Sequence, residues 1–261
     1  ALSGVKLNVT VCITMLVLSL IVVFSGLMTR NVIMDRQPFV NLIIGEIADS
    51  CISVQAEAED DFLRERNADS RVEKLYLYTS LKVSHVGGAE LMATICDDFS
   101  KANNQSVVFE GRFPKYDNEI AIAAKYAKES GLKVGDEIEI TANGKQEKYL
   151  ICGFTQISNN LGKDCLFTRK GYERLGTLMY TGYYLNLLDG TDIDAFNSEM
   201  KEIYEGEVNS AINIQATLEG TGGVYVSLML IIVIVILILS AIIIVFVLYL
   251  LVRTMLNNKQ M

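Results

Sequence analysis

The chain contains few residues of the types that perform catalysis. Its single histidine, His85, stands in a predicted strand, and the sequence offers it no partners for a zinc site or a catalytic triad. No glycine-rich phosphate loop of the G-x-x-x-x-G-K-[ST] type occurs, so the chain has no recognisable means of binding ATP. We therefore expect no catalytic residues, no cofactor, no metal ion and no enzymatic activity.

Three short segments are candidate binding or modification sites. The acidic residues at 57 and 59–61 lack the ligand spacing and the turn glycine of a calcium loop. The acidic stretch 189–194 is explained by the capping of a following helix. Asn104-Gln105-Ser106 fits a glycosylation acceptor, a tripeptide that arises often by chance. We assign a site to none of them.

Hydrophobic residues are concentrated in two uncharged blocks, residues 7–28 and 224–252. A helix rises about 1.5 Å per residue and the hydrocarbon core is about 30 Å thick, so about twenty residues span it. Both blocks predict transmembrane helices, at residues 1–29 and 224–252. A cleaved signal peptide is the competing interpretation of the first block, but the run is long for one and no A-x-A-like site follows it. Neither block contains Asp, Glu, Lys, Arg or His, which argues against an ion or proton path through them.

The charges predict the topology. Residues 30–223 hold all 31 acidic residues and 20 of the 23 basic ones, a net charge of −11, whereas the flanks hold only Lys6, Arg253 and Lys259. Short basic flanks stay in the cytoplasm, so residues 30–223 are expected outside it and residues 253–261 form a cytoplasmic tail. Arg30 and Arg36 lie on the outer side of the first block and oppose this assignment. The acidic domain also excludes nucleic acid as a partner.

Between the blocks, short strands alternate with short helices, which predicts an α+β domain flanked by two transmembrane helices. Strands are expected at 51–54, 75–83, 91–95, 119–123, 137–141, 149–153, 183–188 and 211–214, and helices at 39–47, 57–74, 124–130 and 193–203. Gly87-Gly88 and Asn143-Gly144 predict hairpin turns, and Gly131 predicts a left-handed helix end. Gly220, Gly222 and Gly223 predict a flexible joint before the second block.

The cysteines do not form a disulfide framework. Cys12 lies in the first block, and the other four, Cys51, Cys96, Cys152 and Cys165, are widely spaced in a domain large enough to hold a core without cross-links. We expect small buried residues, with a Cys152–Cys165 bridge on neighbouring strands as the one pairing to test.

Three segments together resemble the FtsX/MacB-like permeases of ABC transporters. Residues 109–122 resemble the family's G-R-x-P-x-x-x-N-E-I segment, residues 131–138 its G-x-K-V-G-D-x-I strand entry, and residues 149–154 the strand that follows. The matched positions are structural in character, and they are Gly111, Arg112, Pro114, Asn118, Glu119, Gly135, Asp136 and Gly153. These residue types are explained by turns at the glycines and at Pro114 and by a strand that begins at Asn118 and Glu119. The motif positions therefore require no catalytic role.

The resemblance implies a function. It implies a bacterial cell-membrane permease whose outer MacB-like domain moves when a separate ABC ATPase hydrolyses ATP. A second permease copy or half, the lipid bilayer and a peptide or lipid-like substrate are the implied partners. Family members have four or more spans and this chain has two, so we expect a part of a larger permease. A two-span membrane sensor with an outer ligand-binding domain is the alternative, and a tethered secreted enzyme is a weaker one because no catalytic set is visible.

Overall fold

The computed structural model describes residues 2–34, 46–157 and 160–258, and it divides into two units. One unit comprises Ala1–Phe39 and Gly220–Met261, and the other, called here the sheet domain, is Val40–Glu219. The helix predicted over residues 39–47 lies almost wholly outside the described residues.

The first unit consists of helices. Helix α1 is Leu2–Met34, and its apolar stretch, Cys12–Leu27, is shorter than a membrane span. Helix α7 is Ile214–Asn258, and within it Leu230–Leu250 is 21 residues long, with a mean hydropathy of 3.8. Among the described residues, this is the one helical segment long and apolar enough to cross a membrane.

Helix α7 corrects one prediction. It starts at Ile214 and continues through Gly220, Gly222 and Gly223, which were expected to form a flexible joint before the apolar block. A glycine inside a helix costs about 1 kcal/mol relative to alanine, and three of them do not outweigh the long apolar helix on their carboxyl side. The strand predicted over residues 211–214 accordingly ends one residue earlier, at Asn213.

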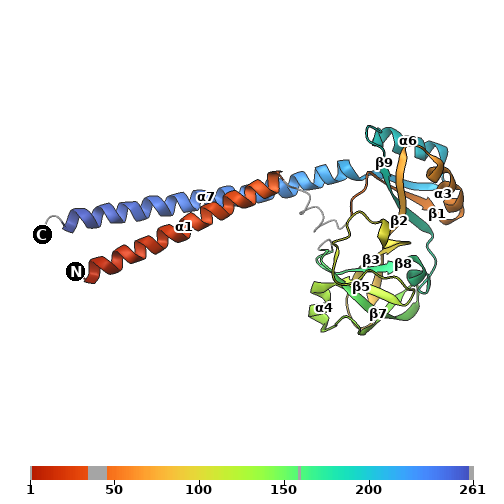
Figure 1. Cartoon of the computed structure of the whole chain (residues 1–261), viewed down its shortest axis with the longest axis horizontal. Helices are drawn as coiled ribbons and strands as arrows, with labels where there is room; N and C mark the ends of the chain where they lie inside the picture. The colour runs from red at the N-terminus through yellow and green to blue at the C-terminus, as the bar shows by residue number, and fades with distance from the viewer. Residues whose placement is uncertain (1, 35–45, 158–159, 259–261) are drawn as a thin grey trace. The chain divides into compact units, whose positions relative to one another are not determined.

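The sheet domain has two lobes that share strand β2, Val72–His85. The open-sheet lobe contains the first half of β2 and three further strands in the order β10-β1-β9-β2, all antiparallel. These strands are β1 (Ser50–Gln55), β9 (Tyr180–Leu187) and β10 (Val208–Asn213). Figure 1 shows this lobe with the labels β1, β9, α3 and α6.

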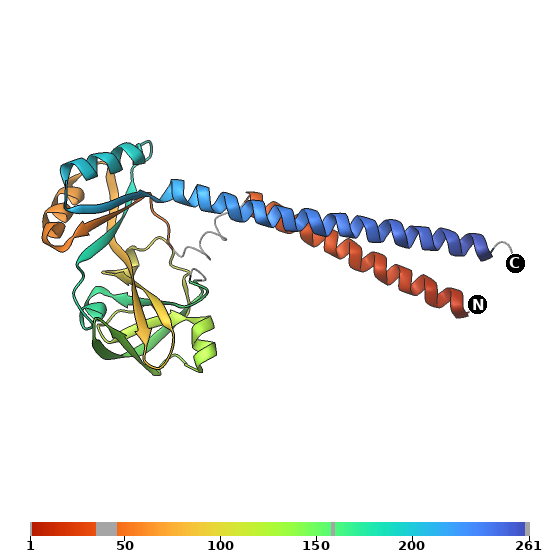
Figure 2. The same cartoon turned by 180° about the vertical axis from the view of Figure 1, so that it is seen from behind.

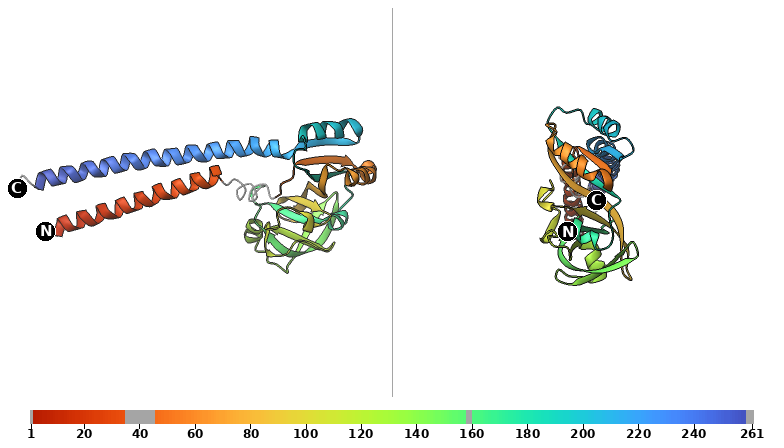
Figure 3. Two further views of the ribbon diagram at one scale, coloured as in Figure 1. Left: turned by 45° about the horizontal axis from the view of Figure 1, so that its top comes forward. Right: turned by 90° about the vertical axis from the view of Figure 1, so that its right-hand side faces the viewer.

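Two helices cover one face of the open-sheet lobe. Alternation along β1 buries Ile52 and Val54 on that face, where Phe62 of α3 (Glu59–Ala68) and Phe196 of α6 (Ile193–Ile203) join the same core. A short 3₁₀ helix, η1 (Ala56–Ala58), precedes α3. Figure 3 shows α3 and α6 together at this lobe. The charged helix predicted over residues 57–74 ends at Ala68, because the chain from Val72 pairs with β9 and residues 75–78 are buried on both faces of the sheet.

The barrel lobe is a closed circuit of six strands. Following the pairings from the second half of β2 leads through β3 (Glu90–Cys96), β8 (Asp164–Thr168), β5 (Glu119–Ala123), β7 (Lys145–Thr155) and β6 (Glu137–Ala142) back to β2. The closing β2–β6 contact is short, with Ser84 opposite Thr141 and His85 opposite Ile140. The fully buried interior includes Leu91, Ile95, Ile120, Ile122, Ile138, Tyr149 and Phe167.

Four short elements complete the barrel lobe, which Figure 2 shows from behind. Strand β4 (Val108–Gly111) pairs with the end of β7. Helices α4 (Ala124–Ser130) and α5 (Arg169–Glu173) follow β5 and β8, and the 3₁₀ helix η2 (Phe99–Lys101) follows β3. The predicted α+β class, with an apolar helix near each end of the chain, is therefore confirmed.

The turns have the conformations that the sequence predicts, whereas the two cysteines proposed as a pair do not lie on neighbouring strands. Asn143 and Gly144 have φ values of 53° and 74° in the β6–β7 turn, and Gly131 ends α4 with a φ of 70°. The suggestion that Cys152 and Cys165 lie on neighbouring strands is wrong, because β5 pairs with both β7 and β8 and separates them. Strands are about 4.8 Å apart, so two strand spacings exceed the reach of a disulfide. All five cysteines are free thiols.

Candidate functional site

Two of the eight motif positions are glycines at which two backbones approach closely. Gly111 is opposite Gly153 where β4 pairs with β7. A Cβ on Gly111 would collide with the Cys152 carbonyl oxygen and lie 2.8 Å from the Gly153 Cα, and the backbone φ of Gly111 is +73°. A Cβ on Gly153 would collide with the Arg112 carbonyl oxygen and lie 2.9 Å from the Arg112 nitrogen. Both positions require glycine for steric reasons.

The motif's acidic residue fastens the loop between β4 and β5. Glu119 is 3% exposed, and its carboxylate accepts hydrogen bonds from both terminal nitrogens of Arg112 and from the backbone N–H groups of Lys115 (2.9 Å) and Tyr116 (3.2 Å). The hydrogen bonds from Arg112 hold the pKa of Glu119 down to about 2, although burial opposes this. The carboxylate is therefore ionised at neutral pH and serves as an acceptor for its own loop.

The remaining motif residues shape the same neighbourhood. Pro114 is buried in the loop, and the Asn118 carbonyl oxygen accepts a 2.8 Å hydrogen bond from the Leu150 N–H of β7. Gly135 has a φ of +96°, and its N–H donates to the Ile151 carbonyl of β7 at 2.9 Å. Asp136 closes this turn by accepting from the Lys133 N–H at 2.8 Å.

The eight motif positions thus meet along one strand, β7, although they come from three separate segments of the sequence. Their side chains and backbones bond to one another and to β7, and the group presents no nucleophile next to a base. This arrangement holds the loop before β5 and the turn before β6 against β7.

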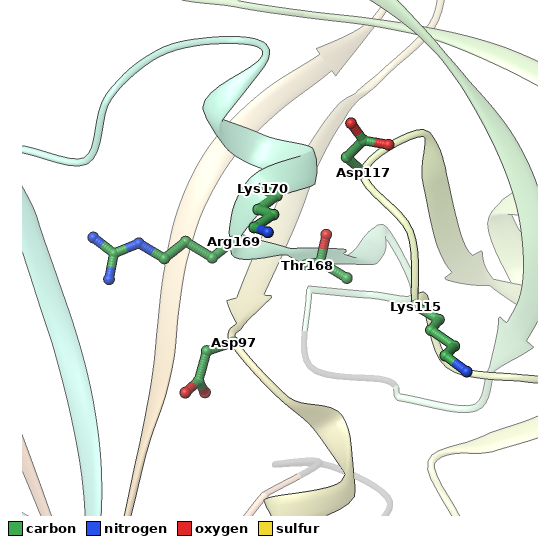
Figure 4. Close-up of a pocket in the computed structure, with 6 residues that line it drawn as sticks. All are labelled: Asp97, Lys115, Asp117, Thr168, Arg169 and Lys170. Carbon is green, nitrogen blue, oxygen red and sulfur yellow. The ribbon is translucent and has the colours of Figure 1, made fainter.

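A cavity of about 300 Å³ lies beside the motif loop, lined by Asp97, Lys115, Asp117, Thr168, Arg169 and Lys170. Figure 4 shows that these side chains do not converge: Arg169 points away from Lys115, and Asp117 and Asp97 lie at opposite ends. Arg169 is engaged elsewhere, because its guanidinium binds Glu59 through two nitrogens at 2.6 and 2.8 Å. Acidic and basic side chains that point away from one another do not form a binding site for one class of ligand.

The Glu59–Arg169 pair connects the two lobes of the sheet domain. Glu59 is the first residue of α3 in the open-sheet lobe, and Arg169 is the first residue of α5 in the barrel lobe. The hydroxyl of Tyr183, from β9, also donates to the Glu59 carboxylate. Burial raises the pKa of Glu59, but the hydrogen bonds from Arg169 and Tyr183 outweigh it and the pKa lies below its ordinary value.

The two ends of the sheet domain meet in the open-sheet lobe, at a junction formed by Asp49, Ser50, Asn213 and Ile214. Ser50 of β1 is opposite Asn213 of β10, the residue directly before α7. The Asp49 carbonyl accepts from the Ile214 N–H at 3.0 Å, and its carboxylate accepts from the Leu187 N–H at 2.8 Å. The Asn213 side chain accepts from the Ala216 N–H at 3.0 Å and caps the first turn of α7.

Sequence reasoning did not find the junction or the Glu59–Arg169 pair. Asn213 directly before a helix is a capping signal that could have been read, since Asn is a preferred N-cap residue. The partners of Asp49 and Glu59 lie far away in the sequence, and no local pattern identifies them.

The other candidates from the sequence are His85 and the acidic stretches. His85 contacts Tyr126, whose hydroxyl lies 2.6 Å from Nδ1, and burial lowers the pKa of the histidine. Within the described ranges, no group of three or more His, Cys, Asp and Glu residues is placed to hold a metal ion. In the acidic stretch 189–194, Asp192 caps helix α6 by accepting from the Ala195 N–H at 2.9 Å.

Comparisons with known proteins find similar structures. No protein-family model matches the chain, and a comparison with curated proteins finds no match. The periplasmic region of MacB from Actinobacillus actinomycetemcomitans is similar, with a TM-score of 0.43 and 8% identity over 73% of this chain and 97% of that one. The extracellular domain of the noncanonic ABC-type transporter YknZ from Gram-positive bacteria has a TM-score of 0.43 and 10% identity, over 62% of this chain and 97% of that one.

A domain of a putative permease from Porphyromonas gingivalis is also similar, with a TM-score of 0.36 and 12% identity, over 62% of this chain and 85% of that one. The MacB-like family that the motifs resemble is thus also represented among the similar structures.

Proposed function

We propose that the chain is a permease subunit, or part of one, of an ABC transporter, in which ATP hydrolysis by a partner ATPase moves the sheet domain outside the cytoplasm. Support comes from the three motif segments in family order and from the apolar helices on either side of the domain. The motif residues bond to one another around β7 and offer no reactive group, which suits a part that moves and does not catalyse.

One observation carries the proposal: β10 passes into α7 without a connecting loop. β10 ends at Asn213, α7 starts at Ile214, and the first turn of α7 is capped by Asn213 and bonded to Asp49. A helix that leaves a sheet through a capped, hydrogen-bonded turn transmits displacement to the sheet, whereas a flexible loop would absorb it. The helix continues for 45 residues and contains the apolar segment Leu230–Leu250.

The location and partners follow from the same proposal. The bilayer surrounds Leu230–Leu250 and the apolar N-terminal helix, and residues 30–223 lie outside the cytoplasm, in accordance with the short basic flanks that hold Lys6, Arg253 and Lys259. A second permease copy or half and a separate ATPase complete the transporter. The outer function is export of a peptide or lipid-like substrate, resistance to antimicrobial peptides, or regulation of the cell envelope.

The decisive experiment interrupts helix α7 between the sheet domain and the apolar segment. Four glycine and serine residues inserted at Gly222, in the complete permease with its ATPase, should abolish the outer function and leave expression and ATP hydrolysis intact. The same insertion in the Asn143-Gly144 turn is the matched control, because that turn is exposed and lies in the barrel lobe. Unchanged transport or resistance after the Gly222 insertion would show that α7 is only an anchor.

Topology is tested by labelling. Gln146 is exposed in the β6–β7 hairpin, and Gln146→Cys in a background without the native cysteines should react with a membrane-impermeant thiol reagent in intact cells. Labelling that occurs only after lysis would place the domain in the cytoplasm and contradict the proposal.

Nucleotide turnover distinguishes the permease from the two-span sensor. The purified chain should not hydrolyse ATP, and turnover should appear only when an ABC ATPase copurifies with it. Stable copurification with a signalling kinase in place of an ATPase would favour the sensor.

A further inference from the structure

The first described residue after segment 35–45 is a buried carboxylate, Glu46, which is 1% exposed. Its Oε1 accepts hydrogen bonds from the Tyr76 hydroxyl and the Asn103 N–H, both at 2.6 Å, and its Oε2 accepts from the Asn104 N–H at 3.1 Å. The Asn103 side chain in turn donates to the Ile47 carbonyl at 2.6 Å. The chain that arrives from α1 is therefore fastened at Glu46.

The groups that bind Glu46 come from both lobes, because Tyr76 lies in the half of β2 that pairs with β9 and the two asparagines lie in a loop of the barrel lobe. Asn103 and Asn104 lie in the loop between β3 and β4, residues 97–107, called here the back loop. Phe99 and Val107 of this loop join a buried cluster with Cys152 and Leu166, which come from barrel strands β7 and β8. A displacement of Glu46 therefore acts on a loop that is packed against the barrel.

The other helix, α7, is connected to the open-sheet lobe. Asp49 lies only three residues after Glu46, and its partners are Leu185 and Leu187 of β9 and the first residues of α7. β10, which leads into α7, pairs with β1 in the open-sheet lobe. Glu46 bonds to both lobes, because Tyr76 belongs to the open-sheet lobe and Asn103 also bonds to Lys74 and Asn186 there. Asp49, in contrast, bonds to the open-sheet lobe and to α7.

We propose that Glu46 is the coupling residue through which displacement of the chain from α1 reaches the barrel lobe, while α7 acts on the open-sheet lobe. This rests on the proposed function for the source of the displacement. Displacement of Glu46 then acts where the back loop meets β2, and it shifts the two lobes against the Glu59–Arg169 pair.

The first test needs only the full chain in lipid nanodiscs. In Glu46→Gln, the side-chain NH₂ group faces a backbone or hydroxyl donor in either orientation of the amide, so at least one hydrogen bond is lost. Hydrogen–deuterium exchange in the back loop should then rise about tenfold or more, while β1 and β10 stay protected. Glu46→Asp, which keeps the charge on a shorter side chain, should give an intermediate increase.

Glu59→Gln is the matched control. It also removes a buried carboxylate that joins the lobes, but its partners are Arg169 and Tyr183, so exchange should rise in residues 169–173 and not in the back loop. Unchanged back-loop exchange in Glu46→Gln, or an equal rise in both variants, would overturn the assignment of Glu46.

The second test measures the movement of the lobes in the complete transporter with its ATPase. Spin labels at Lys128→Cys in α4 and Lys201→Cys in α6, both exposed positions, report the distance between the lobes. We expect a nucleotide-dependent change in this distance that falls by at least half in Glu46→Gln at unchanged ATP turnover, and that persists in Glu59→Gln.

The outcomes separate this inference from the proposed function. A change in distance that is as large in Glu46→Gln as in the unmodified chain overturns the coupling role. An absence of any nucleotide-dependent response in the unmodified transporter contradicts the proposed function itself, and the fastening at Glu46 is then decided by the exchange experiment alone.

Discussion

The barrel lobe and the open-sheet lobe share strand β2 but are stabilised in different ways. In the barrel lobe the pairings return to β2, so its six strands form a closed circuit, and the carboxylate of Glu119 bonds to its own loop. The open-sheet lobe ends at β10, covers one face with α3 and α6, and continues directly into α7. The barrel lobe is thus stabilised by contacts within itself, whereas the open-sheet lobe also depends on the helices α3, α6 and α7 that join it.

This difference assigns the motif residues and the junction residues to different lobes. The positions that resemble the permease family build the barrel around β7, and the junction at Asp49 and Asn213 lies in the open-sheet lobe. Substitutions in the motif should therefore unfold the barrel, and substitutions at the junction should alter coupling with little loss of stability.

The largest effect is expected where two backbones touch. Gly153→Val would place a branched side chain against the Arg112 backbone, which cannot move without breaking the β4–β7 pairing. We expect a loss of about 3 kcal/mol or more in stability, with the barrel lobe exchanging hydrogen far faster than the open-sheet lobe. Chemical unfolding and hydrogen exchange of the full chain in detergent would measure both.

Gly131→Ala is the control for this substitution. Gly131 has a φ of +70°, but a Cβ there would meet no atom within 4 Å, so only backbone strain of about 1 kcal/mol is expected. Equal losses in the two variants would show that left-handed conformation, and not the close approach of backbones, makes glycine necessary at Gly153.

The second effect concerns Glu119. Glu119→Gln keeps the shape but removes the charge that binds Arg112, Lys115 and Tyr116, and we expect a loss of about 2 kcal/mol confined to the barrel lobe. A loss spread evenly over both lobes would contradict the independence of the barrel.

The same residue predicts an acid dependence. Its pKa in the folded chain is lowered to about 2 from an ordinary value of 4.5, so ionised Glu119 contributes stability that is fully present above about pH 4.5. This contribution is lost as the pH falls toward 2, because the unfolded chain binds the proton first. The free energy of unfolding, measured at several values between pH 5 and pH 2, should fall less steeply with decreasing pH in Glu119→Gln than in the unmodified chain.

A smaller effect is expected at the junction. Asn213→Ala removes the cap of α7 and should cost about 1 kcal/mol, seen as faster exchange in residues 214–219 while the barrel lobe is unchanged. Asp192→Ala, which removes the equivalent cap of α6, is the control. Should Asn213→Ala leave exchange at the start of α7 unaltered, the first turn must be held by Asp49 and not by the cap.

The smallest effect concerns His85, at the short β2–β6 contact that closes the barrel. Burial lowers its pKa, so the neutral form is favoured in the folded chain and its contribution to stability is present above the ordinary value of 6.5. Lowering the pH from 7.5 to 5.5 should modestly accelerate exchange at residues 84–85 and 140–141, and His85→Gln should remove this dependence. An acceleration that persists in His85→Gln would assign it to another group.

The sequence by itself determined the features that depend on neighbouring residues. Uncharged apolar runs predicted the two apolar helices, alternation and Asn143-Gly144 predicted the β6–β7 hairpin, and Gly131 predicted the end of α4. The motif glycines predicted turns, and Gly111 and Gly135 have the positive φ values that such turns need. These features follow from the conformational preferences of a few consecutive residues.

Only the tertiary structure decided which distant strands pair. β8 enters between β3 and β5, and this places β5 between Cys152 and Cys165 and excludes their bridge. The helix predicted to reach residue 74 ends at Ala68 because β9 recruits the residues from Val72 into the sheet. The partners of Glu46, Glu59 and Asp49 are likewise set by these pairings. Local sequence limits the conformation of each segment, but the free energy that selects among pairings comes from burying side chains far apart in the chain.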